Sequence, residues 1–208
     1  MAWDSIKVAS YDCGSLEMIK ILSENFNELV ISTGATYDYE IENTVNYLNS
    51  INKKFSLLHC VTIYPTPLEY MNLKRMDYLK RFTPSVGLSE HSLVSLDGIK
   101  ASVAAIYLGA DAVERHFTVL PEEETRDGKV SISKKHLQEL VYFSKLSKND
   151  QKGYICKYIP EFEKMLGCEK RELTKAELLN RDYYRGRFCN KINGNQIFNW
   201  EYEYKINN

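Results

Sequence analysis

The chain has 208 residues, 44% of them hydrophobic and 26% charged, with a formal net charge of -1. This is the composition of an ordinary globular domain with one sizeable core, and the small net charge excludes a general electrostatic attraction to nucleic acid or to an anionic membrane. No apolar run approaches the ~20 residues that span a bilayer.

Two features of the sequence favour the cytoplasm. The N-terminus, which begins Met1-Ala2-Trp3, lacks the basic region and apolar stretch of a secretory signal. The five cysteines are an odd number without C-x-x-C spacing, which is typical of buried or incidental thiols in a reducing compartment. We therefore expect a cytoplasmic protein without nucleic-acid or membrane partners.

Strand-like and helix-like patterns alternate from the first residues to about residue 146. Short apolar runs predict strands at residues 6–10, 29–34, 55–60, 86–91 and 112–117. Apolar residues at helical spacing predict helices at residues 16–26, 39–48, 72–82, 99–108 and 133–146. This alternation predicts repeated βαβ units and a parallel sheet.

Every predicted strand ends in polar residues, and in a parallel barrel the chemistry is placed at those ends. The strands themselves are nearly continuous apolar runs, as expected when helices cover both faces of the sheet. The fold class we predict is therefore α/β, with about five parallel strands and their helices as part of a TIM-type (β/α) barrel. A complete barrel of this type has eight strands.

The composition changes after residue 146. Residues 148–153 read as a polar linker, and short helices are predicted at residues 161–166 and 175–179. The tail, residues 181–208, reads as an irregular ordered extension or a short hairpin, because it contains the turn signal Asn193-Gly194. We expect a partial barrel domain at residues 1–146, followed by a linker and C-terminal extension at residues 147–208.

Two histidines lie at the ends of predicted strands and are candidate metal ligands. His91 and His116 each follow an apolar run, and imidazole suits a transition metal whose remaining positions are open to a substrate oxygen. The alternative is a pair of hydrogen-bonded histidines at strand ends. Glu114 lies two residues before His116, so both side chains point to the same face of a strand. It could act as a base toward water, or form an ion pair with a lysine such as Lys7.

Hydroxyl groups near the ends of other strands suit an anion. Ser10, Ser32 and Ser89, with Lys7, could line a phosphate pocket, although serines are common at such turns. In the loop after the third strand, two prolines would hold Tyr64 in one orientation. Asp127, in the loop after the fifth strand, could bind sugar hydroxyls or belong to a solvated acidic loop.

Taken together, the motifs resemble the sialic acid synthase family. This family includes the N-acetylneuraminate, legionaminate and pseudaminate synthases and related spore-coat polysaccharide proteins. The resemblance rests on five segments that occur in order: KVAS at residues 7–10, ISTG at 31–34, HCVTIYPTP at 59–67, GLSEHS at 87–92 and ERHFT at 114–118. It covers roughly residues 6–146.

The resemblance implies a barrel enzyme that condenses phosphoenolpyruvate with an N-acylated hexosamine such as N-acetylmannosamine. It implies a divalent metal, Mn or Mg, held by His91 and His116, and activation of a water molecule by Glu114. The remaining positions that match residues around the substrates divide into two sets. Those around phosphoenolpyruvate are Lys7, Ser10, Ser32 and Ser89, and those near the two substrates are Thr62, Tyr64 and Asp127, the last two on the sugar side.

The sequence also departs from the family pattern. Thr62 stands where the family commonly has Asn or Ser, and Glu90 where Asp is usual. Family members begin with three further barrel strands and commonly end with an antifreeze-like domain. We therefore expect either a portion of a synthase that is incomplete alone, a complementing or non-catalytic subunit of a split synthase, or an inactive truncated homologue. The expected partners are a second copy or an N-terminal fragment.

Overall fold

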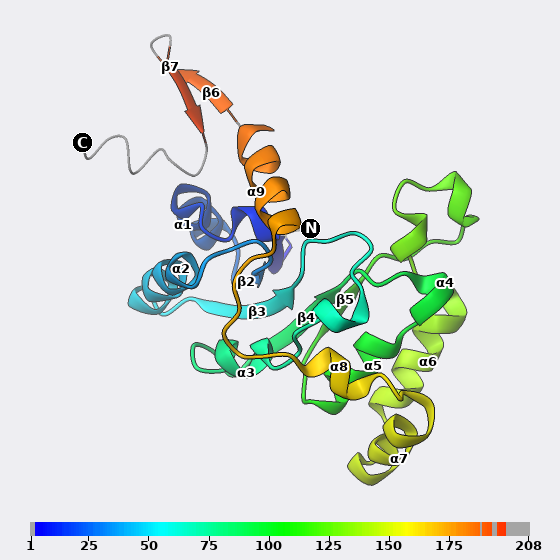
Figure 1. The fold of residues 1–208 in the computed structure, drawn as a ribbon. Coiled ribbons are helices and arrows are strands. Elements are labelled where there is room, and N and C mark those ends of the chain that lie inside the picture. The colour runs from blue at the N-terminus through cyan, green and yellow to red at the C-terminus, as the bar shows by residue number, and fades with distance from the viewer. Residues whose placement is uncertain (1–2, 188, 193–194, 199–208) are drawn as a thin grey trace. The chain divides into compact units, whose positions relative to one another are not determined.

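The computed structural model describes residues 3–187, 189–192 and 195–198. It divides into two compact units, residues 1–57 with 172–208, and residues 58–171. Figure 1 shows the elements along the chain. The five strands of the main sheet are β1 (Ser5–Val8), β2 (Glu28–Ser32), β3 (Lys54–Cys60), β4 (Val86–Glu90) and β5 (Val113–Arg115).

These strands follow the order β1-β2-β3-β4-β5 in one sheet. β1 and β2 pair in parallel from Ser5↔Glu28 to Val8↔Ile31, and β4 and β5 pair in parallel from Leu88↔Val113 to Glu90↔Arg115. Helical segments separate successive strands, as parallel connections require. The predicted fold class, an α/β fold with five parallel strands as part of a TIM-type barrel, is confirmed.

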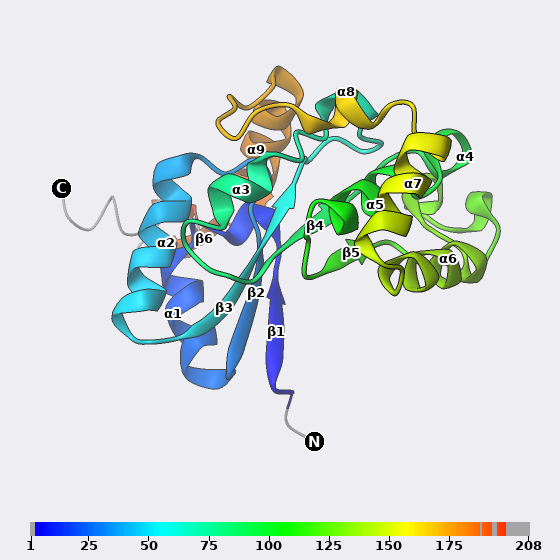
Figure 2. The same ribbon diagram turned by 90° about the horizontal axis from the view of Figure 1, so that it is seen from below.

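In the first unit, two helices accompany β1 and β2. Figure 2 shows α1 (Leu16–Asn25) and α2 (Asp38–Ser50) lying together beside these strands. The amphipathic sequence of α2 buries Ile41, Val45 and Leu48. At its N-terminus the backbone N–H of Tyr37 donates to Glu40 over 2.9 Å, so Glu40 satisfies a donor just before the helix.

The first unit also contains α9 (Lys175–Arg187), which contacts the 3-10 helix η1 (Ser10–Asp12). Arg181 on α9 is buried, donates to the carbonyl oxygen of Ala35 over 2.6 Å and forms an ion pair with Glu40. The rings of Tyr184 and Tyr11 stack with centroids 4.2 Å apart. These contacts join α9 to the loops that follow β1 and β2.

The second unit places its helices around β4 and β5. α5 (Lys100–Tyr107) packs against α6 (Lys134–Ser144) and α7 (Lys148–Tyr158), and small residues on α5 allow the close approach. α8 (Phe162–Leu166) packs on the 3-10 helix η2 (Leu68–Tyr70). The shorter elements of this unit are α3 (Arg75–Leu79), α4 (Val94–Asp97), η3 (Glu122–Glu124) and η4 (Gly128–Val130).

Some local expectations need correction. The helix expected at residues 72–82 is regular only over α3, because Asn72 has a positive φ of 47° and the chain then turns through irregular backbone. Residues 148–153, expected to be a linker, form the first half of α7, where the Ser147 hydroxyl accepts from the Asp150 N–H as the N-cap. A domain boundary at residue 146 stays a prediction.

The tail contains the two strands that a hairpin requires. β6 (Cys189–Ile192) and β7 (Asn195–Phe198) pair antiparallel from Cys189↔Phe198 to Ile192↔Asn195. The predicted turn residues Asn193-Gly194 lie outside the described residues, as does the end of the tail from residue 199. Within the part of the chain that the structure describes, every helix is too short or too polar to cross a membrane.

The backbone of β4 comes very close to its neighbours at Gly87. A Cβ atom there would lie 2.3 Å from the Ala112 carbonyl oxygen and 2.7 Å from Cδ2 of Leu58. That oxygen accepts the Leu88 N–H over 3.0 Å, so it cannot move without loss of a hydrogen bond. Only glycine fits at this position without a shift of β5.

We predict that Gly87→Ala lowers the free energy of unfolding by about 1–3 kcal/mol through overpacking. Gly153→Ala is the matched control, because Gly153 lies in α7 with no atom within 4 Å of the added Cβ. It should raise stability by up to about 1 kcal/mol. Urea denaturation of both variants measures the difference, and equal midpoints would contradict the packing argument.

Candidate functional site

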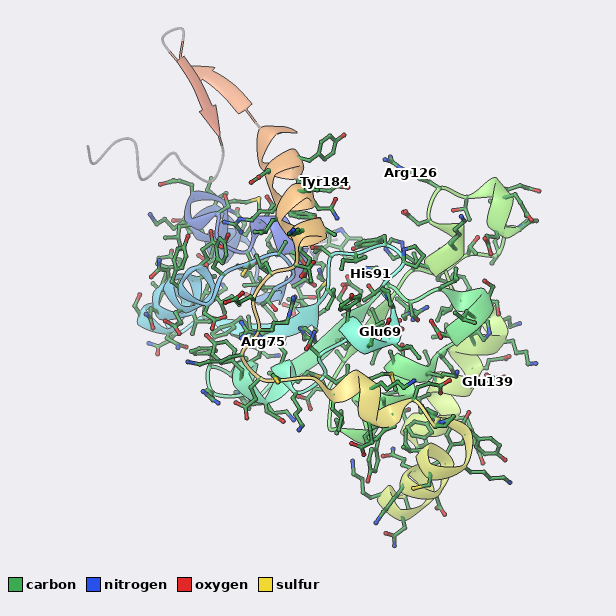
Figure 3. The ribbon with its side chains drawn as sticks, in the orientation of Figure 1. Glu69, Arg75, His91, Arg126, Glu139 and Tyr184 are labelled. Carbon is green, nitrogen blue, oxygen red and sulfur yellow. The ribbon has the colours of Figure 1, made fainter. Side chains whose placement is uncertain are left out.

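The ends of β4 and β5 bring two histidines together. Glu90 and Arg115 are register partners, so the residues that follow them, His91 and His116, leave the sheet side by side. Their ring centroids are 5.3 Å apart with the planes at 65°. His91 is buried, and Figure 3 shows it beyond the end of β4.

The loop after β3 covers this pair. The Tyr64 ring lies 3.9 Å from the His91 ring and 6.2 Å from the His116 ring, measured between centroids. The Thr66 N–H donates to the His91 carbonyl oxygen over 2.8 Å, which joins the loop to the end of β4. Tyr64 therefore lies against both imidazoles, and the expectation that the two prolines hold it in one orientation stays a prediction.

The loop after β5 supplies a carboxylate. Asp127 Oδ2 lies 3.7 Å from Nδ1 of His116. Beside it is a cavity of about 330 Å³, lined by Tyr64, Pro65, Glu122, Glu123, Thr125, Arg126, Asp127, Lys129 and Val130. Arg126, labelled in Figure 3, belongs to this loop and lines the cavity. The cavity therefore presents both carboxylates and cations to a polar ligand.

A glycine closes this loop. A Cβ at Gly128 would lie 2.1 Å from the carbonyl oxygen of Glu122, so the backbones of the two ends of the loop touch at this point. The Gly128 N–H also donates to Thr125 O over 3.2 Å. Glycine is required here for close approach of two backbone segments.

Behind the histidines is a buried ion pair. Arg115 and Glu90 face each other with side chains only 3% and 0% exposed. Burial lowers the pKa of the Arg115 guanidinium to about 10, which still leaves it charged at neutral pH. The Ser102 hydroxyl on α5 donates to Glu90 over 2.7 Å, which places this pair on the helix side of the strands.

The histidine pair fits a divalent metal as two of its ligands. A metal–nitrogen bond of about 2.1 Å to each ring would put the ring centroids roughly 5 Å apart, close to the observed 5.3 Å. Among the residues that the structure describes, no group of three or more His, Cys, Asp or Glu side chains is arranged to hold a metal.

Glu114 and Ser89 lie beside this pair in the sheet. They are register partners on β5 and β4, with Ser89 buried and Glu114 half-buried. Thr62, in the loop after β3, is also buried. The second unit thus contains seven of the predicted site residues: Thr62, Tyr64, Ser89, His91, Glu114, His116 and Asp127. The role of each stays a prediction.

The other three predicted site residues, Lys7, Ser10 and Ser32, belong to the first unit. The Ser10 hydroxyl accepts the Gly34 N–H over 3.0 Å, and Lys7 Nζ donates to the Val8 carbonyl oxygen over 3.0 Å. The Ser32 hydroxyl, at the end of β2, is buried and has no hydrogen-bond partner within the described part of the chain. Such a hydroxyl is costly unless a ligand or water satisfies it.

Sequence reasoning missed two contributors to the site. Cys60 is buried, as the prediction of buried or incidental thiols allowed, but its Sγ also lies 3.9 Å from Nδ1 of His91, a neighbour that its spacing did not indicate. The Glu90–Arg115 pair was not foreseen either. Its signal was present, because each histidine is preceded directly by a charged residue at the end of an apolar strand.

The fold and this arrangement define an α/β barrel-type protein with a polar site at the ends of its strands. The NeuB family model matches residues 1–152. The chain belongs to the NeuB family.

Among curated relatives, the chain is 31% identical over 183 residues to N,N'-diacetyllegionaminic acid synthase of Campylobacter jejuni, covering 86% of this chain and 49% of that protein. It is 29% identical over 188 residues to the spore coat polysaccharide biosynthesis protein SpsE of Bacillus subtilis, covering 88% and 49%. The chain therefore spans about half the length of these relatives.

Solved structures show the same likeness. The crystal structure of Bacillus subtilis SpsE superposes with a TM-score of 0.69 at 26% identity, covering 83% of this chain and 48% of that one. The N-acetylneuraminic acid synthetase of Leptospira borgpetersenii, in complex with citrate, gives a TM-score of 0.63 at 26% identity, with 89% and 58% covered.

We predict that Tyr64→Leu shifts the ring-proton resonances of His91, because the aromatic ring stacked on this imidazole is removed. Tyr70→Leu is the control, since Tyr70 is 46% exposed and Tyr64 48%. Histidine-selective labelling resolves the four histidines of the chain. A His91 resonance that stays in place in Tyr64→Leu would contradict the stacking.

Proposed function

We propose that this chain carries the metal-binding part, and much of the substrate-binding part, of a nonulosonic (sialic-type) acid synthase. The reaction is condensation of phosphoenolpyruvate with an N-acylated hexosamine, N-acetylmannosamine being the simplest. The observation that carries the proposal is the His91–His116 pair beneath Tyr64, next to the cavity at Asp127. The names of the relatives as acid synthases support it.

The histidine pair would hold Mn or Mg. When bound, the cation would polarise the carbonyl oxygen of the acceptor sugar. His91 and His116 would each donate one ring nitrogen, and the acceptor would enter through the cavity beside them. Tyr64 and Asp127 would orient the sugar, the ring by apolar contact and the carboxylate by accepting hydrogen bonds from hydroxyl groups.

The chemistry forms one carbon–carbon bond and releases phosphate. The methylene carbon of phosphoenolpyruvate bonds to the aldehyde carbon of the acceptor, water adds to the carbon that bears the phosphate, and phosphate leaves. Glu114 would accept a proton from that water. Its half-buried position on β5, paired with Ser89 in the register, supports a role at the strand ends.

The hydroxyls of the site would bind phosphoenolpyruvate. The buried, unsatisfied hydroxyl of Ser32 supports this, because a carboxylate or phosphate oxygen of the substrate would accept its hydrogen bond. Ser10 and Lys7 lie on the neighbouring strand and its loop, where a cation and a hydroxyl suit an anion. The same role is proposed for the hydroxyls of Ser89 and Thr62 in the second unit.

Closure of the barrel requires strands beyond these five. Strand number, tilt and stagger are tied together in a barrel, so five strands cannot close one of eight. The remaining strands would come from further sequence of the same protein or from a complementing fragment. The active form would be a homo-oligomer or such a complemented assembly, and it would act in the cytoplasm on soluble substrates.

We predict that His116→Ala reduces phosphate release from phosphoenolpyruvate and N-acetylmannosamine to background in the presence of Mn²⁺, when the chain is complemented with the N-terminal half of a NeuB relative. The expected cause is loss of one of two protein ligands of the cation. His136→Ala is the control, because His136 lies at the start of α6, where its N–H donates to Ser133. Full activity after the His116 change would remove the metal assignment.

We also predict that phosphate release requires the remaining strands. The assay is run with this chain alone and with the N-terminal half of a NeuB relative added, against a panel of acceptor hexosamines. Activity should be at background for the chain alone and should rise when the fragment is added. Full turnover by the chain alone would show that five strands suffice.

A further inference from the structure

One charged pair at the site takes no part in the proposed reaction. Glu90 and Arg115 are completely enclosed, on the helix side of β4 and β5, while the residues that follow them carry the imidazoles. Charges in such a place are costly, because both ions lose their hydration.

The contacts of Glu90 hold the backbone around His91. Oε1 of Glu90 accepts the backbone N–H of Ser92 over 2.7 Å, and Oε2 accepts the Ser102 hydroxyl over 2.7 Å. Glu90 and Ser92 are the two neighbours of His91. The hydrogen bond from the Ser92 N–H to the Glu90 carboxylate therefore fixes the backbone conformation at His91, which carries the imidazole.

The contacts of Arg115 reach three segments. Nη1 pairs with Glu90 and also donates to the Ser92 hydroxyl over 3.3 Å. Nη2 donates to the carbonyl oxygen of Val130 over 3.3 Å. Arg115 itself directly precedes His116, and Val130 is part of the wall of the cavity at Asp127.

The Arg115 guanidinium thus links the residues on either side of His91, the strand end that carries His116, and the loop that lines the cavity at Asp127. We infer that Glu90 and Arg115 are positioning residues, which hold the two imidazoles at the separation needed to share one divalent cation. The inference rests on the proposed function for the cation, and on the observed contacts for the positioning. A lysine could not replace this arginine, since a single ammonium lacks the planar fork that reaches Glu90, Ser92 and Val130 together.

The test removes the pair without leaving an unpaired buried charge. In the double variant Glu90→Gln with Arg115→Met, both residues keep similar volume, and such replacements of a buried pair are often neutral for stability. The matched control is Glu40→Gln with Arg181→Met. That pair is also buried, with side chains 10% and 3% exposed, and it lies in the other unit, whereas all four histidines lie in residues 58–171.

Two readouts are taken on the full chain, neither of them activity. The first is the nuclear Overhauser effect between the ring protons of His91 and His116 in histidine-labelled protein without metal, with His59 and His136 as internal references. The second is Mn²⁺ affinity, measured by electron paramagnetic resonance titration. The inference predicts loss of the ring-to-ring signal and affinity weaker by about 10- to 100-fold in the first double variant, with neither change in the control.

A folded Glu90→Gln/Arg115→Met variant that keeps both the signal and the Mn²⁺ affinity would overturn the inference. If that variant does not fold, Arg115→Lys decides the question, because it keeps the buried charge. Arg115→Lys should weaken Mn²⁺ affinity several-fold and alter the His91–His116 ring-to-ring signal. If neither the affinity nor the signal changes in this variant, the inference is again overturned. If the wild-type chain shows the ring-to-ring signal but binds no Mn²⁺, the proposed metal site is refuted. The ring-to-ring signal of the variants then still tests whether Glu90 and Arg115 position the imidazoles.

Discussion

The site depends on one constraint, the parallel pairing of β4 with β5 in the register that places Glu90 opposite Arg115. Because side chains alternate between the faces of a strand, this register places both the Glu90–Arg115 pair and the His91–His116 pair. The charged pair faces α5 and is enclosed, and the imidazoles that follow leave on the other side. A slip of one residue would exchange the two faces and bury the histidines against the helices.

The two pairs are therefore linked in energy as well as in space. The buried ions stabilise the sheet only through good geometry, since each ion lost its hydration on folding. Nε of Arg115 has no partner within the described part of the chain, which adds to that cost. Gly87 contributes by letting β4 approach its neighbours closely, and the Thr66 N–H holds the covering loop to His91. Stability near the site and the placement of its chemistry depend on the same residues.

Much of this was predictable from the sequence. All five strands fall where the apolar runs placed them, and the histidines meet because parallel strands end at the same edge. The exceptions have physical causes. Residues 148–153 are polar, yet they form a helix because Ser147 caps it and Gln151 and Ile155 are buried. The helix expected at residues 72–82 is shortened at Asn72, whose backbone turns against Gly167, a contact across more than ninety residues of sequence that periodicity does not report.

The cavity at Asp127 is built almost entirely from one stretch of the chain. Apart from Tyr64 and Pro65, its lining comes from one continuous segment, residues 122–130, whose ends touch at Gly128 and Glu122. This segment is continuous in sequence and follows β5, the strand that leads to His116. Substitutions or insertions in this segment would therefore change the cavity without changing the sequence of β4 and β5.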